Sequence, residues 1–221
     1  MKNLLFGCAL LFATSGCVTV PFQEASLVPM DDAGPRDVVV RFQRELPERF
    51  HALNTVVFEV MGRKFSGIGY IDIDAPGRRF KVVCLNPMGV KLFELSGDGA
   101  NVVTHYAIGP LAERPEVASA IGEDFRRMYF DMVPAPGARV WKRKYRINYY
   151  QPFEQGTLQY VFAGEDGNLI EKNYYEDGYI VWRARYYEYQ HQDGHRFPRG
   201  ILYQQFRSGY HLLVKTKEIA G

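Results

Sequence analysis

From residue 54 onward, apolar and polar residues alternate in short runs separated by turn-forming residues. Around residue 182, for example, Ile180, Trp182 and Ala184 alternate with Arg183 and Arg185, the period of two that places one face of a strand on a core. Five such runs lie at 55–61, 65–74, 79–85, 90–95 and 101–107, and six more at 142–150, 157–163, 168–174, 179–189, 199–206 and 210–218. Within each group the connections are short turns, which join antiparallel neighbours. The pattern therefore predicts an antiparallel sheet of about eleven strands.

Two segments have helical spacing instead. In 35–46, Val38, Phe42 and Leu46 recur every four residues, Pro35 suits a first helical turn, and Pro47 ends the helix or kinks it. A longer helix is expected over 113–133, ended by the prolines that follow it. Its apolar stripe is Val117, Ile121, Phe125, Met128 and Met132, and its opposite, polar face is Glu123, Asp124, Arg126 and Arg127.

Eleven strands are too many for a flat sheet, which curls or closes. We therefore expect an α+β fold, a large curved antiparallel sheet in the form of a half-barrel, with the longer helix covering its opening. The alternation alone leaves two interiors open: an apolar concavity that holds a ligand, or a filled core.

The N-terminus indicates an exported, lipidated protein. A short positive start is followed by a ten-residue apolar run, 4–13, which is too short to span a bilayer and is typical of a secretory signal. The small residues before Cys17 resemble the lipobox of bacterial lipoproteins, which implies acylation of Cys17; the alternative is an ordinary signal with an incidental cysteine. Val18 stands where Asp would resemble an inner-membrane retention signal, which favours the outer membrane. We therefore divide the chain into a signal peptide (1–16), a lipidated tether (17–34) and one domain (35–221).

Composition narrows the possible partners. With 27 basic and 25 acidic residues the formal charge is +2, so no global field attracts nucleic acid or anionic lipid. Of three cysteines, only Cys84 remains as a thiol if Cys8 leaves with the signal and Cys17 carries lipid. Cys84 lies in an apolar run and is expected to be a buried core residue. The 15 Tyr, 15 Phe and 2 Trp give 32 rings, and twelve of the tyrosines follow residue 140.

Catalytic and metal signals are weak. His191 and His195 flank an Asp-Gly turn, which is more typical of a solvated hairpin tip than of a zinc site. The sequence contains no Gly-x-Ser-x-Gly elbow, phosphate loop or Ser-x-x-Lys motif. We expect neither an enzyme nor a cofactor or metal.

Residues 79–96, RFKVVCLNPMGVKLFELS, resemble the middle of the LolB family of outer-membrane lipoprotein receptors, in which an Asn-Pro-Leu-Gly turn joins two strands. Here the turn is Asn86, Pro87, Met88 and Gly89, and the order of helices and strands is also similar. The resemblance implies an eleven-stranded half-barrel whose cavity takes acyl chains of lipoproteins delivered by a periplasmic LolA-like carrier. It also implies that Met88 protrudes and contacts the membrane; the alternative is that Met88 folds back onto the sheet.

These observations lead to two hypotheses. In the first, an outer-membrane-anchored lipoprotein binds acyl chains of lipoproteins or lipids and helps their insertion, with Tyr160, Phe162 and Trp182 as candidates to line the cavity. In the second, a structural or assembly lipoprotein of an envelope complex binds a protein partner through its tyrosine-rich strands. Neither hypothesis involves nucleic acid.

Overall fold

The computed structural model describes residues 20–220; the signal peptide and Cys17 lie outside the described residues. The first half contains α1 (Pro35–Glu45), β1 (Arg49–Val60), β2 (Arg63–Asp74), β3 (Arg79–Leu85), β4 (Lys91–Gly97), β5 (Val102–Ala107), α2 (Gly109–Ala112) and α3 (Pro115–Tyr129). The second half contains β6 (Arg139–Arg143), β7 (Arg146–Phe153), β8 (Gly156–Ala163), β9 (Asn168–Glu176), β10 (Tyr179–Gln192), β11 (His195–Gln205) and β12 (Tyr210–Ala220).

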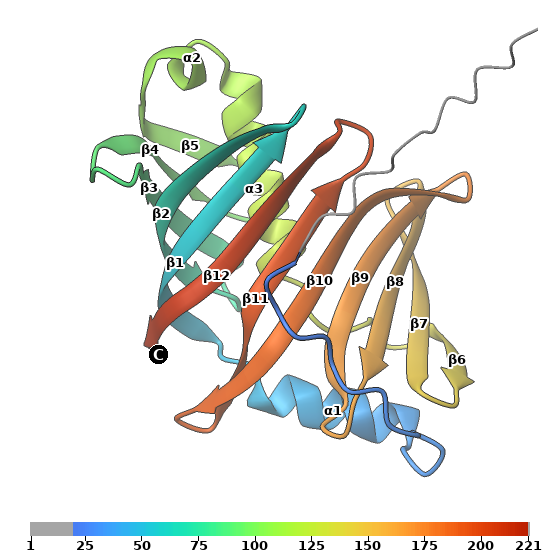
Figure 1. Ribbon diagram of the computed structural model, residues 1–221. Coiled ribbons are helices and arrows are strands. Elements are labelled where there is room, and N and C mark those ends of the chain that lie inside the picture. Colours follow the sequence, from blue (N-terminus) through green and yellow to red (C-terminus); the bar gives the residue numbers. More distant parts are fainter. Residues whose placement is uncertain (1–19, 221) are drawn as a thin grey trace, which may run out of the picture.

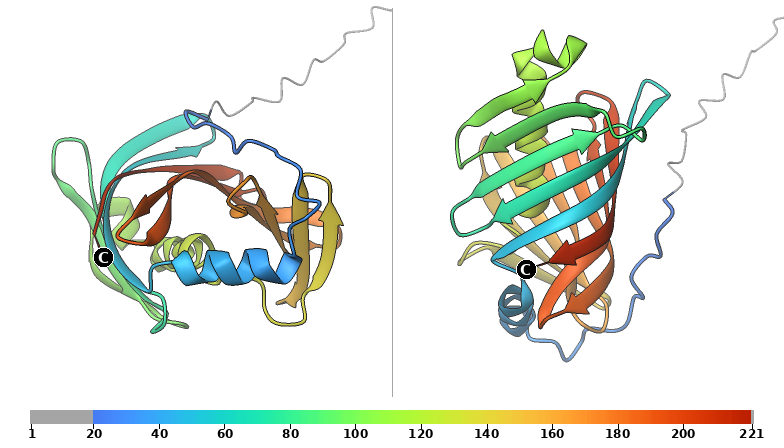
Figure 2. Two further views of the ribbon diagram at one scale, coloured as in Figure 1. Left: turned by 90° about the horizontal axis from the view of Figure 1, so that it is seen from below. Right: turned by 90° about the vertical axis from the view of Figure 1, so that its left-hand side faces the viewer.

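The strands form a single sheet in the order β5-β4-β3-β2-β1-β12-β11-β10-β9-β8-β7-β6. All neighbours are antiparallel, and the two meanders meet where β1 pairs with β12, with Val56 opposite Val214. The sheet curls around α3 and stays open between β5 and β6 (Figures 1 and 2). The α+β half-barrel expected from the sequence is therefore confirmed.

The sheet has twelve strands rather than eleven because residues 142–150, expected to be one strand, belong to two. β6 and β7 form a hairpin that turns at Lys144 and Tyr145, with Arg143 opposite Arg146. This turn contains no Gly, Pro, Asn or Asp, so the sequence has no turn signal there. The pairing of β6 with β7 is visible only in three dimensions.

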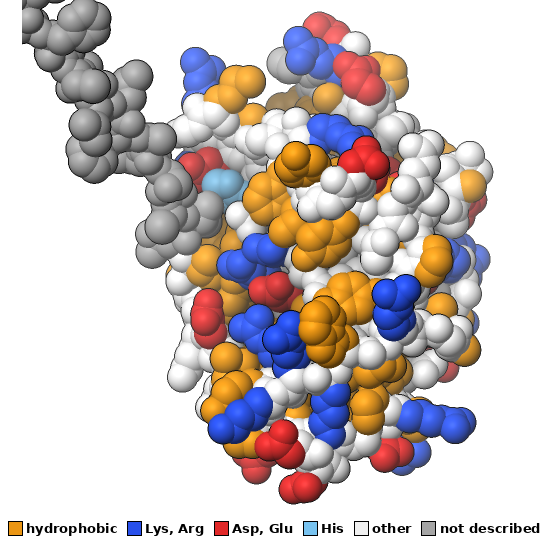
Figure 3. All heavy atoms as spheres, turned by 90° about the vertical axis from the view of Figure 1, so that its right-hand side faces the viewer, with side chains coloured by type: hydrophobic (Ala, Val, Ile, Leu, Met, Phe, Trp, Pro, Cys, Tyr) orange, Lys and Arg blue, Asp and Glu red, His pale blue; other side chains and the backbone are white. Residues whose placement is uncertain are grey.

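β6 is an open edge of the sheet, and it is strongly basic. All five of its residues are exposed, and Arg143 lies 4.2 Å from the centroid of the Trp141 ring. The face beside this edge shows hydrophobic and basic side chains intermixed (Figure 3). Charges on an edge strand prevent it from pairing with another chain.

The second half of α3 is covered by the half-barrel on both of its faces, whereas Glu116, Ser119 and Ala120 in its first half are exposed. Ile121 and Phe125 pack with the cluster on β1–β4, as the stripe predicts. Part of the face expected to be solvated is buried: Asp124 is 7% and Arg126 8% exposed, whereas the Glu123 side chain is 47% exposed. The sequence pattern is wrong for the two buried residues because polar groups of the sheet and of the β4–β5 turn replace water. Arg126 donates to the carbonyl oxygens of Asp98 and Asn101 at 2.9 and 2.8 Å.

α3 is also shorter than the expected 113–133. It ends at Tyr129, and its C-cap residue Phe130 is extended (φ −103°, ψ 165°). The chain then continues as an irregular segment through 130–133, which matters for the cavity described below.

The segment expected to be a tether is in fact packed on the convex face over its described part. Phe22 is buried against Tyr187 and Leu202 and lies over Gly200, where a Cβ would come within 2.6 Å of the Phe22 ring. At the far end of this segment, the Met30 amide donates to the carbonyl of Lys144 at 2.7 Å. We call residues 20–34 the strap. It crosses from the middle of the convex face to the end where α1 lies (Figure 1).

Candidate functional site

A cavity of about 290 Å³ lies between the concave face of the sheet and the two helices. Its walls are β1, β2, β11 and β12, the end of α1, and the end of α3 with the segment that follows it. Three neighbouring rings belong to its lining. The Phe50 ring lies 5.7 Å from that of Phe197 and 6.2 Å from that of Tyr129, measured between ring centroids. The lining is mostly apolar, and the volume is close to the lower end of small-molecule pockets, about 300 Å³. The cavity therefore suits a slender apolar ligand.

The end of α3, which forms one wall, is held by buried polar groups on the sheet. Lys172 on β9 is 2% exposed, and its Nζ donates to the carbonyl oxygens of Arg127 and Phe130 at 2.9 and 2.8 Å. The hydroxyl of Tyr186 on β10 donates to the carbonyl of Met128 at 2.9 Å. The last carbonyls of a helix have no partner within it, so these side chains fix where α3 stops. Burial lowers the pKa of Lys172 to about 7.

A second group of side chains holds α3 to β11 and β12. The Tyr210 hydroxyl donates to Asp124 at 2.6 Å, and Arg127 donates to the Tyr203 hydroxyl at 3.1 Å. The Arg127 guanidinium also lies 5.6 Å from the Trp182 ring centroid. Burial raises the pKa of Asp124 to about 6, although Tyr210 and Arg127 act in the opposite direction.

Four of the twelve tyrosines after residue 140 thus hold the helices. The Tyr149 hydroxyl donates to the carbonyl of Pro35 at 2.6 Å and fixes the start of α1, while Tyr186, Tyr203 and Tyr210 hold α3. Each ring packs in the apolar interior while its hydroxyl reaches a polar group of a helix, the usual arrangement of a buried tyrosine.

Ion pairs close two sides of the cavity. Arg78, in the turn between β2 and β3, donates to both carboxylate oxygens of Asp131 at 2.7 and 3.1 Å. Glu45 at the end of α1 accepts from Nε of Arg196 on β11 at 2.7 Å and pairs with His191 at 3.3 Å. The Arg78 and Asp131 side chains are 46% and 47% exposed, whereas those of Arg196 and Glu45 are 3% and 26% exposed, so water screens the Arg78–Asp131 pair more strongly. The Arg78–Asp131 side is therefore the weaker closure.

The three rings expected to line the cavity lie elsewhere. Tyr160, Phe162 and Trp182 face inward but are 0%, 0% and 1% exposed within the core cluster that contains α1, and the cavity lining does not include them. This half of the barrel interior is filled core, the second of the two interiors that the alternation left open. The sequence reasoning missed Phe50 and Phe197, because both fall outside the expected strands and are adjacent only after folding.

The turn at 86–89 is ordered and projects from the β3–β4 hairpin. Asn86 Oδ1 accepts from the amides of Met88 and Val90, each at 2.9 Å, and Gly89 has φ +82°. Met88 is 85% exposed, so it does not fold back onto the sheet. Its contact with a membrane remains a prediction.

Other expectations concern groups outside the cavity. Cys84 is buried as expected, and burial raises its pKa to about 11, which makes it an unreactive thiol. Among residues 20–220, no group of three or more His, Cys, Asp or Glu side chains forms a potential metal site. Within the same range, no helix has the length and hydropathy needed to cross a membrane.

Comparison with known proteins rests on structure. No protein-family model and no curated protein matches the sequence. A LolA superfamily protein from Nitrosomonas europaea superposes with a TM-score of 0.59 at 10% identity, over 83% of this chain and 91% of that chain. The chain has a LolA-like fold.

Two further solved structures align over similar lengths with lower scores. A domain described as an outer membrane lipoprotein-sorting protein from Vibrio parahaemolyticus has a TM-score of 0.49 at 7% identity, over 84% of this chain and 89% of that one. A DUF1329 family protein from Desulfovibrio piger has a TM-score of 0.47 at 11% identity, over 83% and 90%. The fold assignment rests on the Nitrosomonas protein alone.

Proposed function

We propose that this protein is a cell-envelope lipoprotein that binds acyl chains of lipoproteins or lipids in its cavity and helps their insertion in the outer membrane. The single observation that carries the proposal is the mostly apolar cavity around Phe50, Tyr129 and Phe197, beneath helices that polar side chains hold in place. The LolA-like fold supports it. The role is binding and not catalysis, with Cys17 as the lipid anchor in the outer membrane.

The size of the cavity implies that loading widens it. Burying a methylene contributes about 0.8 kcal/mol, so each carbon that enters favours a wider state. The Arg78–Asp131 closure and the irregular residues 131–133 are on the side that opens at least cost. The clamp formed by Lys172 and Tyr186 keeps the rest of α3 in place while this side opens.

Delivery needs a donor and a membrane. A periplasmic LolA-like carrier is the proposed donor of acylated passengers. The exposed Met88 on its stiff turn is the proposed point of contact with the acceptor membrane. Transfer of the acyl chains from the carrier to this protein and on to the membrane needs no energy source, because the chains are buried away from water before and after each step.

Acyl binding is tested by native mass spectrometry of the purified protein for co-purifying acyl chains, and by binding of a fluorescent 16-carbon fatty acid. Ala75 borders the cavity, so we expect Ala75→Trp to fill it and to weaken binding of the probe at least tenfold. Val40 is 44% exposed on α1 and outside the cavity, so Val40→Trp is the control. Equal binding by the two variants, or no acyl chain and no probe binding in the wild type, would refute the proposal.

The delivery role is tested in cells. Depletion of the protein is expected to leave other lipoproteins at the inner membrane, and Met88→Glu is expected to retain fatty-acid binding while blocking release into vesicles. Normal lipoprotein localisation after depletion would exclude the receptor role even if acyl chains bind.

The alternative, an assembly lipoprotein that binds a protein through tyrosine-rich strands, needs an exposed tyrosine surface. Tyr160, Tyr174, Tyr186 and Tyr203 are at most 2% exposed, and the hydroxyls of Tyr186 and Tyr203 are engaged with α3. These four tyrosines therefore do not supply that surface, and the alternative depends on exposed ones such as Tyr145 (39%) and Tyr179 (80%).

A further inference from the structure

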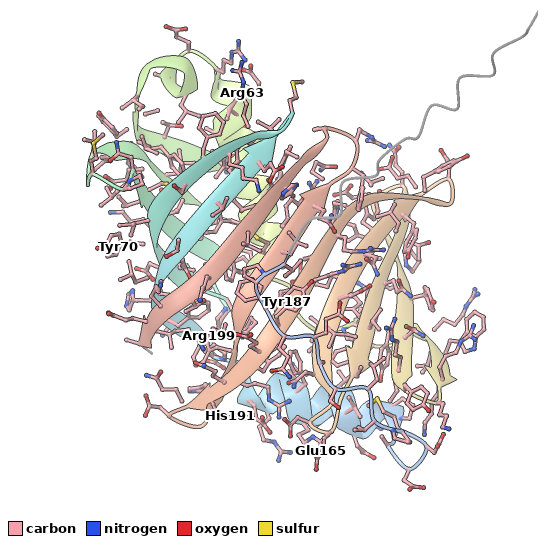
Figure 4. The ribbon with its side chains drawn as sticks, viewed as in Figure 1. Arg63, Tyr70, Glu165, Tyr187, His191 and Arg199 are labelled. Atoms are coloured by element: carbon pink, nitrogen blue, oxygen red, sulfur yellow. The ribbon has the colours of Figure 1, made fainter. Side chains whose placement is uncertain are left out.

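The hairpin turns at the two ends of the half-barrel differ in character. Because all strands are antiparallel, the β1–β2, β3–β4, β9–β10 and β11–β12 turns lie at one end, and the β8–β9 and β10–β11 turns lie at the other, beside α1 (Figure 1). At the first end, large apolar side chains are exposed: Met61 92%, Met88 85%, Tyr179 80% and Phe206 46%. At the second end, the β8–β9 and β10–β11 turns contain Glu165, Asp166 and Asp193, and the β6–β7 turn contains Lys144 and Tyr145, of which Tyr145 is 39% exposed. In Figure 4, Arg63 marks the first end, and His191 and Glu165 mark the second.

The β1–β2 turn contains a residue type that is unusual for its backbone conformation. Met61 (φ +50°) and Gly62 (φ +73°) are the two central residues of this hairpin, and positive φ at both positions favours Asn-Gly or Asp-Gly. The β9–β10 and β10–β11 hairpins follow that rule with Asp177-Gly178 and Asp193-Gly194, with the same backbone conformation. Methionine at this position is unfavourable for the turn and gains no burial. A local rule broken without structural benefit points to function.

The neighbours of Met61 suit a lipid surface with anionic headgroups. Arg63 is exposed and Phe65 is 56% exposed on the same tip, and the Lys64 side chain is 68% exposed while it pairs with Glu59 at 3.2 Å. One apolar tip flanked by two basic residues enters the interface of a bilayer while its charges stay at the headgroups.

The described part of the strap runs from the middle of the convex face to the α1 end. Phe22 is fixed over Gly200 and Leu202, and downstream residues run away toward the α1 end, where Met30 binds Lys144. Leu202 precedes Phe206, at the start of the β11–β12 turn, by four residues, which is about 13 Å along the strand. Of the described strap, the part at Val20 and Phe22 therefore lies nearer to the Met61 end than the part at Met30 does.

We propose that the β1–β2 hairpin, through Met61 and Phe65 with Arg63 and Lys64, is a second membrane-contact element that sets the half-barrel upright on an anionic bilayer. This inference rests on the proposed function for its membrane partner. It adds an orientation: the end with the exposed hairpin tips faces the lipid, and α1 faces away from it.

The test uses an environment-sensitive fluorophore on single cysteines in the lipidated full-length chain, reconstituted in vesicles of phosphatidylethanolamine and phosphatidylglycerol without passenger. Cys84 is buried with a raised pKa and is not labelled at neutral pH. We expect a blue shift and quenching by brominated lipid for Met61→Cys, and neither for Tyr145→Cys in the β6–β7 turn at the opposite end. A water-exposed signal at position 61, or a lipid-exposed signal at position 145, overturns the orientation.

A second measurement separates membrane contact from folding. Met61→Asn improves the turn, so its stability is expected to equal or exceed that of the wild type, while binding of the non-acylated chain to the same vesicles falls about tenfold. Asp193→Asn makes the equivalent change in the opposite hairpin and is expected to leave vesicle binding unchanged. Equal binding by wild type and Met61→Asn overturns the proposal. Positions 61 and 193 both lie outside the cavity lining, so a difference in vesicle binding between the two variants is independent of whether the cavity binds acyl chains.

Discussion

Nζ of Lys172 lies 2.8 Å from the carbonyl oxygen of Phe130, so a residue of β9 terminates a helix that precedes it by more than forty positions. The same ammonium group binds the carbonyl of Arg127 at 2.9 Å. A buried lysine is costly unless its donors are satisfied. Here the two hydrogen bonds of Nζ offset part of the cost of burial, and they also fix the wall of the cavity.

Lys172 makes stability pH-dependent above neutrality. Burial lowers its pKa to about 7 in the folded protein, against about 10.4 in the unfolded chain. Between these values the unfolded chain binds more protons, so the free energy of unfolding rises with pH, by about 3 kcal/mol between pH 7 and pH 9.5. Lys172→Met is expected to remove this rise, measured by urea unfolding across the window. A parallel pH profile for wild type and variant would contradict it.

Asp124 has the opposite effect at acid pH. Its pKa is raised to about 6 by burial, above the unfolded value of about 3.9, so the folded protein binds more protons between these values. The resulting stability is present below pH 4 and is lost as pH rises through 6, by about 3 kcal/mol. Asp124→Asn is therefore expected to raise the free energy of unfolding at pH 7 relative to the wild type, and to have little effect at pH 4. Denaturant unfolding at both pH values checks this, and a gain at pH 4 as large as that at pH 7 would refute it.

Tyr186 is expected to act through its hydroxyl. Tyr186→Phe leaves the ring in place and removes the hydrogen bond to Met128, so we expect a loss of about 1–3 kcal/mol in the free energy of unfolding, together with faster hydrogen exchange at the end of α3. Tyr179→Phe on the same strand is the control, because Tyr179 is 80% exposed. Equal stability of the two variants would show that the hydrogen bond from Tyr186 to Met128 contributes nothing to the free energy of unfolding.

The strap is expected to depend on the glycine beneath it. In Gly200→Ala the new Cβ would lie within 2.6 Å of the Phe22 ring, so the strap is displaced at a cost of about 1–3 kcal/mol. Cleavage after Glu24 by a glutamyl endopeptidase is expected to accelerate about tenfold while the half-barrel remains intact. Phe22→Ala alone is expected to release the strap to the same extent, and combining the two changes is expected to add nothing further. Additive effects in this double-mutant cycle would show that Phe22 and Gly200 act independently.

Local pattern determined much of this fold, because alternation and turn residues report on neighbours close in the chain. The meanders, α1 and the buried Cys84 follow from runs of a few residues, and the exposed Met88 from a single turn. The resemblance of residues 79–96 to the LolB family is in keeping with the LolA-like fold that the structure shows.

Tertiary structure decided what depends on contacts between distant segments. The strap packs on strands more than 150 residues away, and α3 buries Asp124 and Arg126 because polar partners surround it on both sides. The cavity is lined by Phe50 and Phe197 rather than by Tyr160 or Trp182, since the half-barrel is filled on one side and hollow on the other. The local sequence pattern does not show which inward-facing rings are packed in the core and which line the cavity, because that depends on where the helices end inside the curved sheet.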